Sequence, residues 1–133
     1  MTDKKISILL IEDSKEDIEL LKMAFKSERF LCQLQVARDG EEALQIIQSS
    51  ESVPHLIILD MNLPGASGPE ILKILRAQEK YDKMPVLIMT TVAPSKEMAE
   101  IEQFPKTHIK TKPFEFSEYK NVVNTIRDLV NSK

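Results

Sequence analysis

The chain has 133 residues, a length that fits one domain with a substantial buried core. Its hydrophobic fraction of 42% and charged fraction of 29% are those of an ordinary globular protein, and a net charge of −3 argues against direct binding to nucleic acid. No apolar run is long enough for a membrane span or an export signal, and the single cysteine, Cys32, cannot form an internal disulfide. We therefore expect a cytoplasmic protein that contacts neither nucleic acid nor membrane.

Short apolar runs of strand length alternate along the chain with segments of helical periodicity. In chain order, the predicted strands cover residues 6–11, 34–37, 56–59, 85–91 and 107–111. The predicted helices are one of three to four turns from Lys15 with Ser14 or Asp13 as its N-cap, one with Ala43, Leu44 and Ile47 on its apolar stripe, one entered at Pro69, a weaker one over about 95–103 and a last one over about 117–130.

This alternation predicts an α/β fold, a flavodoxin-like doubly wound five-stranded parallel sheet of order 2-1-3-4-5 with helices on both faces. No internal repeat, low-complexity tract or linker interrupts the pattern. We therefore expect residues 1–133 to form a single domain with no output domain.

Polar side chains follow the apolar strands where the predicted sheet ends. In a doubly wound sheet the carboxyl ends of strands one, three, four and five meet along one rim, which is where ligands bind. The residues expected at this rim are Glu12, Asp13, Asp60, Thr90, Thr91 and Lys112. The sequence therefore predicts that acids, hydroxyls and one amine converge there.

The acids at this rim are the residue types that hold a divalent cation. Two carboxylates about 4 Å apart repel by about 4 kcal/mol at an effective dielectric constant of about 20, so Asp13 beside Asp60 is not a stabilising arrangement by itself. Hard oxygen ligands without His or Cys indicate Mg²⁺ or Mn²⁺. We expect Asp13 and Asp60 to bind the metal directly, the backbone carbonyl of Asn62 to supply a third ligand, and Glu12 to act largely through a metal-bound water.

A carboxylate, a hydroxyl and an ammonium beside such a metal are the groups that phosphoryl transfer requires. In this interpretation Asp60 is the nucleophile that accepts the phosphoryl group. Thr90 donates a hydrogen bond to one phosphoryl oxygen, and Lys112 pairs with another.

Each of these residues also has a simpler explanation when it is taken alone. Asp60 fits an N-cap or an Asx-turn, Glu12 and Asp13 suit the start of a helix, Thr90 is a good strand former, and Lys112 suits a solvated loop. The placement of all of them at one rim is what favours a phosphoryl-transfer site over these alternatives.

From Ile6 to the last helix, the chain resembles the response-regulator receiver domains of two-component signalling. The family has an acidic pair after strand one, a phosphoacceptor Asp after strand three, Ser or Thr after strand four and Lys-Pro after strand five. Four motifs match in this order, namely Glu12-Asp13, Asp60, Thr90 and Lys112-Pro113.

The resemblance implies a phospho-accepting response regulator that takes a phosphoryl group from the phospho-histidine of a sensor histidine kinase or a phosphotransfer protein. It further implies Mg²⁺ at the site, a cis peptide before Pro113, and a stand-alone regulator similar to the small ones paired with phytochrome-type or other hybrid sensor kinases. Phosphorylation is then expected to pull Thr90 and Lys112 inward and to change the face formed by helix four, strand five and helix five. The same face is the candidate surface for a homodimer.

The chain departs from the family at three places. The switch position, commonly Tyr or Phe, is Ile109, so the usual aromatic rotamer change is not available. Thr91 stands where a smaller residue is common, which predicts tighter access for the phosphoryl group. Asn62 and Val92 occupy the two positions that flank the acceptor in the family, and the second of them offers neither an acid nor an amide to orient an attacking water. We therefore expect slow self-dephosphorylation.

Residues outside the rim are given simpler roles. Of the two histidines, neither His55 nor His108 is expected to be a ligand or a base. The apolar residues around the last strand are expected to lie partly in the core, with an exposed patch for dimerisation or kinase contact as the alternative. They are Phe104, Ile109, Phe114, Phe116 and Tyr119.

Three other functions compete with the receiver interpretation. A pseudo-receiver that only binds partners would lack the acceptor, a metal-binding acid or the lysine, and none of these is missing. A phosphatase of the haloacid dehalogenase type would require a second Asp two residues after Asp60, where this chain has Asn62. A flavin binder would require a phosphate-binding loop after the first strand, where Glu12 and Asp13 would repel the phosphate. No turnover enzyme is therefore expected.

Overall fold

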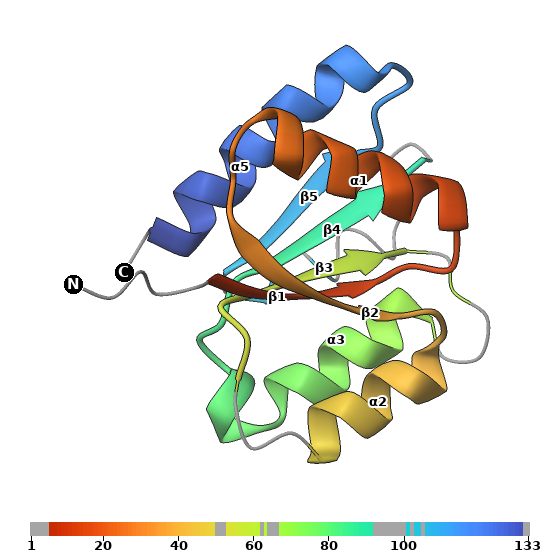
Figure 1. Ribbon diagram of the computed structural model, residues 1–133. Coiled ribbons are helices and arrows are strands. Elements are labelled where there is room, and N and C mark those ends of the chain that lie inside the picture. The colour runs from red at the N-terminus through yellow and green to blue at the C-terminus, as the bar shows by residue number, and fades with distance from the viewer. Residues whose placement is uncertain are drawn as a thin grey trace.

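The computed structural model describes residues 6–49, 53–61, 63, 67–91, 101, 103–104 and 106–131. Within them, five parallel strands form one sheet of order β2-β1-β3-β4-β5 (Figure 1). The strands are β1 (Ile6–Ile11), β2 (Cys32–Ala37), β3 (Leu56–Asp60), β4 (Val86–Thr90) and β5 (Thr107–Thr111). The predicted flavodoxin-like order is confirmed.

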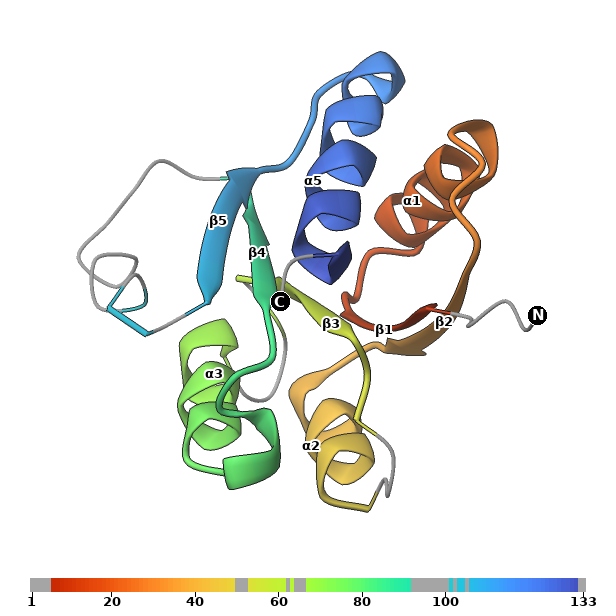
Figure 2. The same cartoon turned by 90° about the vertical axis from the view of Figure 1, so that its left-hand side faces the viewer.

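Helices cover both faces of this sheet (Figures 1 and 2). One face carries α1 (Lys15–Ser27) and α5 (Tyr119–Asn131), and the other carries α2 (Gly40–Ser49) and α3 (Gly68–Arg76). Two short 3-10 helices, η1 (Glu79–Tyr81) and η2 (Phe116–Glu118), were not predicted. The helix predicted over 95–103 lies largely outside the described residues. In the described part of the chain, every helix is too short or too polar to cross a lipid bilayer.

The sheet separates two layers of apolar packing because neighbouring strand residues point to opposite faces. In β1, Ile8 and Leu10 pack on the α1 and α5 side, whereas Leu9 and Ile11 pack on the α2 and α3 side. All five residues of β3 are buried, and so are all five residues of β4. Because both faces of these strands are covered, their residues form the continuous apolar runs 56–59 and 86–89, and the polar residue of each strand, Asp60 or Thr90, is its last.

Several predicted boundaries shift by one or two residues. Ser14 caps α1 as expected, since its hydroxyl accepts a hydrogen bond from the Asp17 amide at 3.2 Å. Ser67 caps α3, so this helix begins at Gly68 and Pro69 occupies its second position rather than the first. The last helix begins after η2, two residues later than predicted.

Arg76, the last residue of α3, contacts the turn before β4 and the start of β5, a role that the sequence analysis did not predict. Its Nη1 donates to the carbonyl oxygens of Tyr81 at 2.8 Å and Met84 at 2.7 Å, and its Nη2 donates to the carbonyl of Lys106 at 3.2 Å and the Thr107 hydroxyl at 3.3 Å. Burial lowers the pKa of this guanidinium. Arg76 thereby fixes the turn before β4 and the start of β5 relative to α3.

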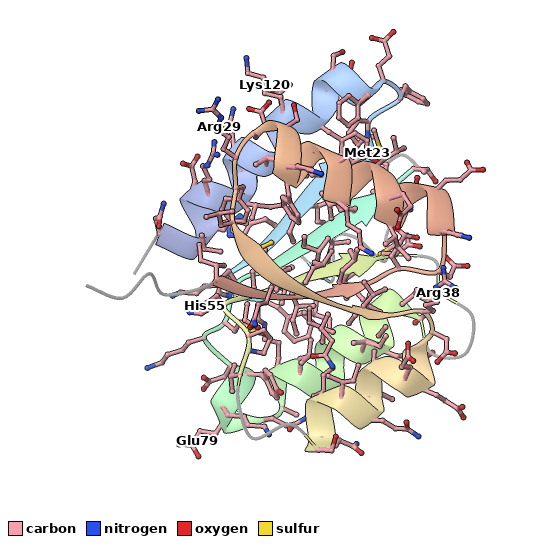
Figure 3. The ribbon with its side chains drawn as sticks, in the orientation of Figure 1. Met23, Arg29, Arg38, His55, Glu79 and Lys120 are labelled. Carbon is pink, nitrogen blue, oxygen red and sulfur yellow. The ribbon has the colours of Figure 1, made fainter. Side chains whose placement is uncertain are left out.

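His55 has a structural contact at the opposite edge of the sheet from the predicted site. Its Nδ1 accepts a hydrogen bond from the Ser7 amide at 2.9 Å, and its own amide donates to the Ser7 carbonyl at 2.7 Å. Figure 3 shows His55 at one end of the sheet and Arg38, which directly follows β2, at the other. This histidine therefore joins the entries of β1 and β3, while His108 is exposed on the edge strand.

Candidate functional site

The carboxyl ends of the strands bring the predicted site residues to one edge of the sheet (Figure 1). Glu12 and Asp13 follow β1, Asp60 is the last residue of β3, and Thr90 is the last residue of β4. Lys112 follows β5, and its amide donates a hydrogen bond to the Thr90 carbonyl at 2.7 Å. The fourth predicted metal-site residue, Asn62, lies outside the described residues.

Three acids meet at this edge. Glu12, Asp13 and Asp60 each present a carboxylate oxygen within 4.8 Å of the others. Glu12 and Asp60 are buried, whereas Asp13 is exposed, so the cluster is open to solvent on the Asp13 side. Three hard oxygen donors gathered where they repel one another fit a divalent cation that prefers oxygen ligands.

Glu12 is the most deeply buried carboxylate of the three. Its Oε2 accepts a hydrogen bond from the Ser14 amide at 3.1 Å, and its Oε1 lies 2.9 Å from the Lys112 Nζ. Burial raises its pKa to about 7, against the hydrogen bond from Lys112, and the charge of Asp60 adds to the increase. Without a bound cation, this group therefore prefers to keep its proton well above the ordinary range of a glutamate.

Lys112 is the cation of the site, and its ammonium contacts three carboxylates. Nζ lies 2.9 Å from Glu12 Oε1, 2.9 Å from Asp17 Oδ2 and 3.5 Å from Asp60 Oδ1. Burial alone would lower its pKa, but the hydrogen bonds to Glu12 and Asp17 and the charges around it outweigh burial, so that the pKa is raised. Lys112 is therefore held as a cation and is not the solvated loop lysine of the simpler explanation.

Thr90 is buried at the end of β4, beside these charges in the register of the sheet. Asp60 is paired with Met89, the residue before Thr90, and Thr90 itself is paired with Thr111. Its side chain is only 2% exposed, whereas Thr91 is exposed. Thr90 thus lies on the strand between β3, which ends in Asp60, and β5, which Lys112 follows.

The expected cis peptide before Pro113 is wrong. Every peptide bond within the described ranges, the one between Lys112 and Pro113 included, is trans. The trans form of an X–Pro bond is favoured by about 0.5–1 kcal/mol, so this isomer requires no special local cause. Lys112 reaches the acids from a trans linkage.

Asp17 is a contact of the site that the sequence interpretation missed. It lies in the first turn of α1, beside other charged residues. Its carboxylate accepts a hydrogen bond from Lys112 Nζ at 2.9 Å. A signal was available, because Ser14 and Asp17 have the spacing of a helix cap, which fixes the start of α1 beside the rim.

Gly68 lies against the end of β3, next to the main chain of Asp60. A Cβ at this position would be 3.0 Å from the Asp60 carbonyl oxygen and 3.2 Å from the Cα of Met61. Contacts this short with backbone are tighter than most Cβ atoms make, so a larger residue here would require the start of α3 or the end of β3 to shift by a few tenths of an ångström.

The aromatic residues near β5 divide between core and surface. Tyr119 is buried, Phe104 is half-buried and packs on the α3 side of the sheet with Ile109, and Phe114 is 94% exposed. A hollow of about 400 Å³ lies beside Phe114, between β5 and the start of α5. The expectation that this set lies partly in the core is therefore confirmed.

Comparisons with known proteins agree with the geometry. The family model of the response regulator receiver domain matches residues 8–124. Over 125 residues the chain is 28% identical to the probable methanogenesis regulatory protein FilR2 of Methanothrix harundinacea, covering 91% of this chain and 81% of that protein. It is 35% identical to the response regulator Rcp1 of Synechocystis over 89 residues, 63% of this chain and 60% of Rcp1.

Solved structures show the same likeness. The phosphorylated cyanobacterial phytochrome response regulator RcpA superposes with a TM-score of 0.84 at 28% identity, covering 97% of this chain and 96% of that one. The Mn²⁺-bound form of Rcp1 superposes with a TM-score of 0.81 at 27% identity, covering 92% of each chain. Because the family model spans most of its length, the chain belongs to the response regulator receiver domain family of two-component signalling.

Proposed function

We propose that this chain is a phospho-accepting response regulator that receives a phosphoryl group on Asp60. The observation that carries the proposal is the position of Asp60, whose Oδ1 lies 3.5 Å from the Lys112 ammonium and whose carboxylate belongs to a cluster of three acids. A nucleophile, a neutralising cation and a metal-binding set are thus within reach of one phosphoryl group.

The proposed donor is the phospho-histidine of a sensor histidine kinase or a phosphotransfer protein. A carboxylate oxygen of Asp60 attacks phosphorus, the P–O bond forms as the P–N bond breaks, and the electron pair of that bond stays on the imidazole nitrogen. The other ring nitrogen of the phospho-histidine carries a proton, so the ring leaves as neutral imidazole. Lys112 neutralises one phosphoryl oxygen and the Thr90 hydroxyl donates to another. Both groups are buried enough for these interactions to be weakly screened.

The chemistry of the donor set fits Mg²⁺ or Mn²⁺. Glu12, Asp13 and Asp60 would hold the ion, with the carbonyl of Asn62 as a further ligand and Glu12 acting largely through water. When bound, the ion supplies positive charge to the carboxylates and to the phosphoryl oxygens. The Mn²⁺-bound form of Rcp1 and the phosphorylated form of RcpA support this assignment by likeness.

Two features set the proposed partner and output. RcpA is a phytochrome response regulator, so a phytochrome-type sensor kinase in the cytoplasm is the proposed source of the phosphoryl group. Phosphorylation then draws Thr90 and Lys112 inward and changes the surface formed by β5, α5 and the helix expected before β5, where dimer formation is the proposed readout. With Ile109 half-buried against the core, the switch does not depend on an aromatic rotamer.

Incubation with acetyl phosphate tests the proposal directly. We expect Mg²⁺-dependent, base-labile phosphorylation that Asp60→Asn abolishes and that the matched variant Asp128→Asn, an exposed position on α5, leaves intact. The label should be lost slowly, without turnover of phosphate esters. Label that persists in Asp60→Asn would overturn Asp60 as the acceptor. No label on the native chain at any Mg²⁺ concentration would favour a pseudo-receiver that only binds partners.

A further inference from the structure

Asp17 shares the functional lysine with the acceptor, although it stands outside the four motifs that define the receiver pattern. Its Oδ2 lies 2.9 Å from the Lys112 Nζ, closer than Asp60 Oδ1 at 3.5 Å. An ammonium has three hydrogens to donate, and here three carboxylates surround it. The two shorter contacts, to Glu12 and Asp17, hold the ammonium on the α1 side of the site.

The first turn of α1 fixes Asp17 in this place. Its amide donates to the Ser14 hydroxyl at 3.2 Å, so the helix cap sets the direction of the Asp17 side chain. The carboxylate is partly exposed, at 31%, whereas the lysine side chain is 12% exposed. Asp17 and Lys112 also line the same small cavity, together with the buried Tyr119.

We infer that Asp17 is a positioning residue that competes with the acceptor for Lys112 and thereby restrains phosphorylation. This inference rests on the proposed function. A phosphoryl group on Asp60 needs one of the three ammonium hydrogens and adds negative charge close to Asp17. Both effects oppose the phosphorylated state, so removing the Asp17 charge should favour it, and the lysine links the state of the site to the first turn of α1.

Beryllofluoride, which mimics the phosphoryl group on a carboxylate, tests this in the full chain. With Mg²⁺ at saturation, ¹⁹F NMR and calorimetry should show that Asp17→Asn binds beryllofluoride about threefold to tenfold more tightly than the native chain. Asp17→Glu restores the charge and should return the affinity toward the native value. Glu16→Gln removes the same charge from an exposed neighbour on the same turn and should leave the affinity unchanged.

A second readout follows the lysine itself. The ¹H–¹⁵N signal of the Lys112 ammonium should shift in Asp17→Asn without beryllofluoride and should stay in place in Glu16→Gln. Circular dichroism checks that each variant is folded, and Asp17→Ser serves as the second variant if Asp17→Asn is not.

The outcomes separate this inference from the proposed function. A native chain that does not bind beryllofluoride overturns the proposed function. A native chain that binds it, together with an Asp17→Asn variant whose affinity is unchanged or weaker, overturns the role of Asp17 and leaves the proposed function standing.

Discussion

The Tyr81 hydroxyl donates a hydrogen bond to the Ile47 carbonyl at 3.0 Å and so joins η1 to the last turn of α2. Tyr81 is 1% exposed and packs in the core between α2, α3 and the sheet. The carbonyls of the last helical turn have no partner within their own helix, and this one finds its donor 34 residues further along the chain.

Tyr81→Phe should therefore lower the free energy of unfolding by about 1–3 kcal/mol, because it leaves a buried carbonyl without a donor while the ring still fills its space. Urea unfolding followed by circular dichroism measures the change. Binding of beryllofluoride should be unaffected, since Tyr81 precedes β4 at the edge remote from Asp60. An unchanged stability would mean that water replaces the hydroxyl.

Arg76→Lys should destabilise the fold by about 2–4 kcal/mol. A lysine lacks the planar guanidinium group, so it cannot contact the Tyr81 and Met84 carbonyls together with the Lys106 carbonyl. Partly buried acceptors then lose their donor. Lys73→Ala, one turn earlier on the exposed face of α3, is the matched control and should change the free energy of unfolding by less than about 0.5 kcal/mol. Equal effects of the two substitutions would contradict the joining role of Arg76.

Stability without divalent cations should decrease as the pH rises from about 4.5 to about 7. The folded protein raises the Glu12 pKa from 4.5 to about 7, so in this interval the native state binds more protons than the unfolded state. The Glu12 contribution is present below pH 4.5 and is lost as the pH passes 7, with a size of about 2–3 kcal/mol. Glu12→Gln should flatten this part of the profile in urea unfolding experiments. A native profile parallel to that of Glu12→Gln would show that Glu12 ionises normally.

Mg²⁺ should raise the thermal unfolding temperature, because it binds the native acidic cluster and not the unfolded chain. A concentration one hundred times the dissociation constant would add about 2.7 kcal/mol of stability. Asp13→Asn should remove most of this increase, whereas Asp128→Asn should retain it, and calorimetric scans with Mg²⁺ and with a chelator compare the two. Loss of the increase in Asp128→Asn would place the ion elsewhere.

The strands and the rim were predictable because their signals are local. Apolar runs such as 56–59 end in an acid, and the parallel order then places Asp60 beside Glu12 and Lys112 without further information. The contacts of Arg76 and Tyr81 could not be predicted, because each joins distant parts of the chain through a side chain that has no distinguishing local pattern. For Asp17, the cap spacing indicates the start of α1 but not the contact with Lys112. The prediction of a cis peptide before Pro113 was wrong because the cis and trans forms of an X–Pro bond differ by only about 1 kcal/mol, and the Lys-Pro motif alone does not select one.

The close approach of Gly68 to the acceptor strand makes a residue without any functional group decisive for the chemistry. In Gly68→Ala, the new methyl group would lie 3.0 Å from the Asp60 carbonyl oxygen, and the atoms that must shift by a few tenths of an ångström are backbone atoms rather than the end of a flexible side chain. A random mutagenesis screen for loss of phosphate acceptance should accordingly recover substitutions at this glycine as well as at the charged positions.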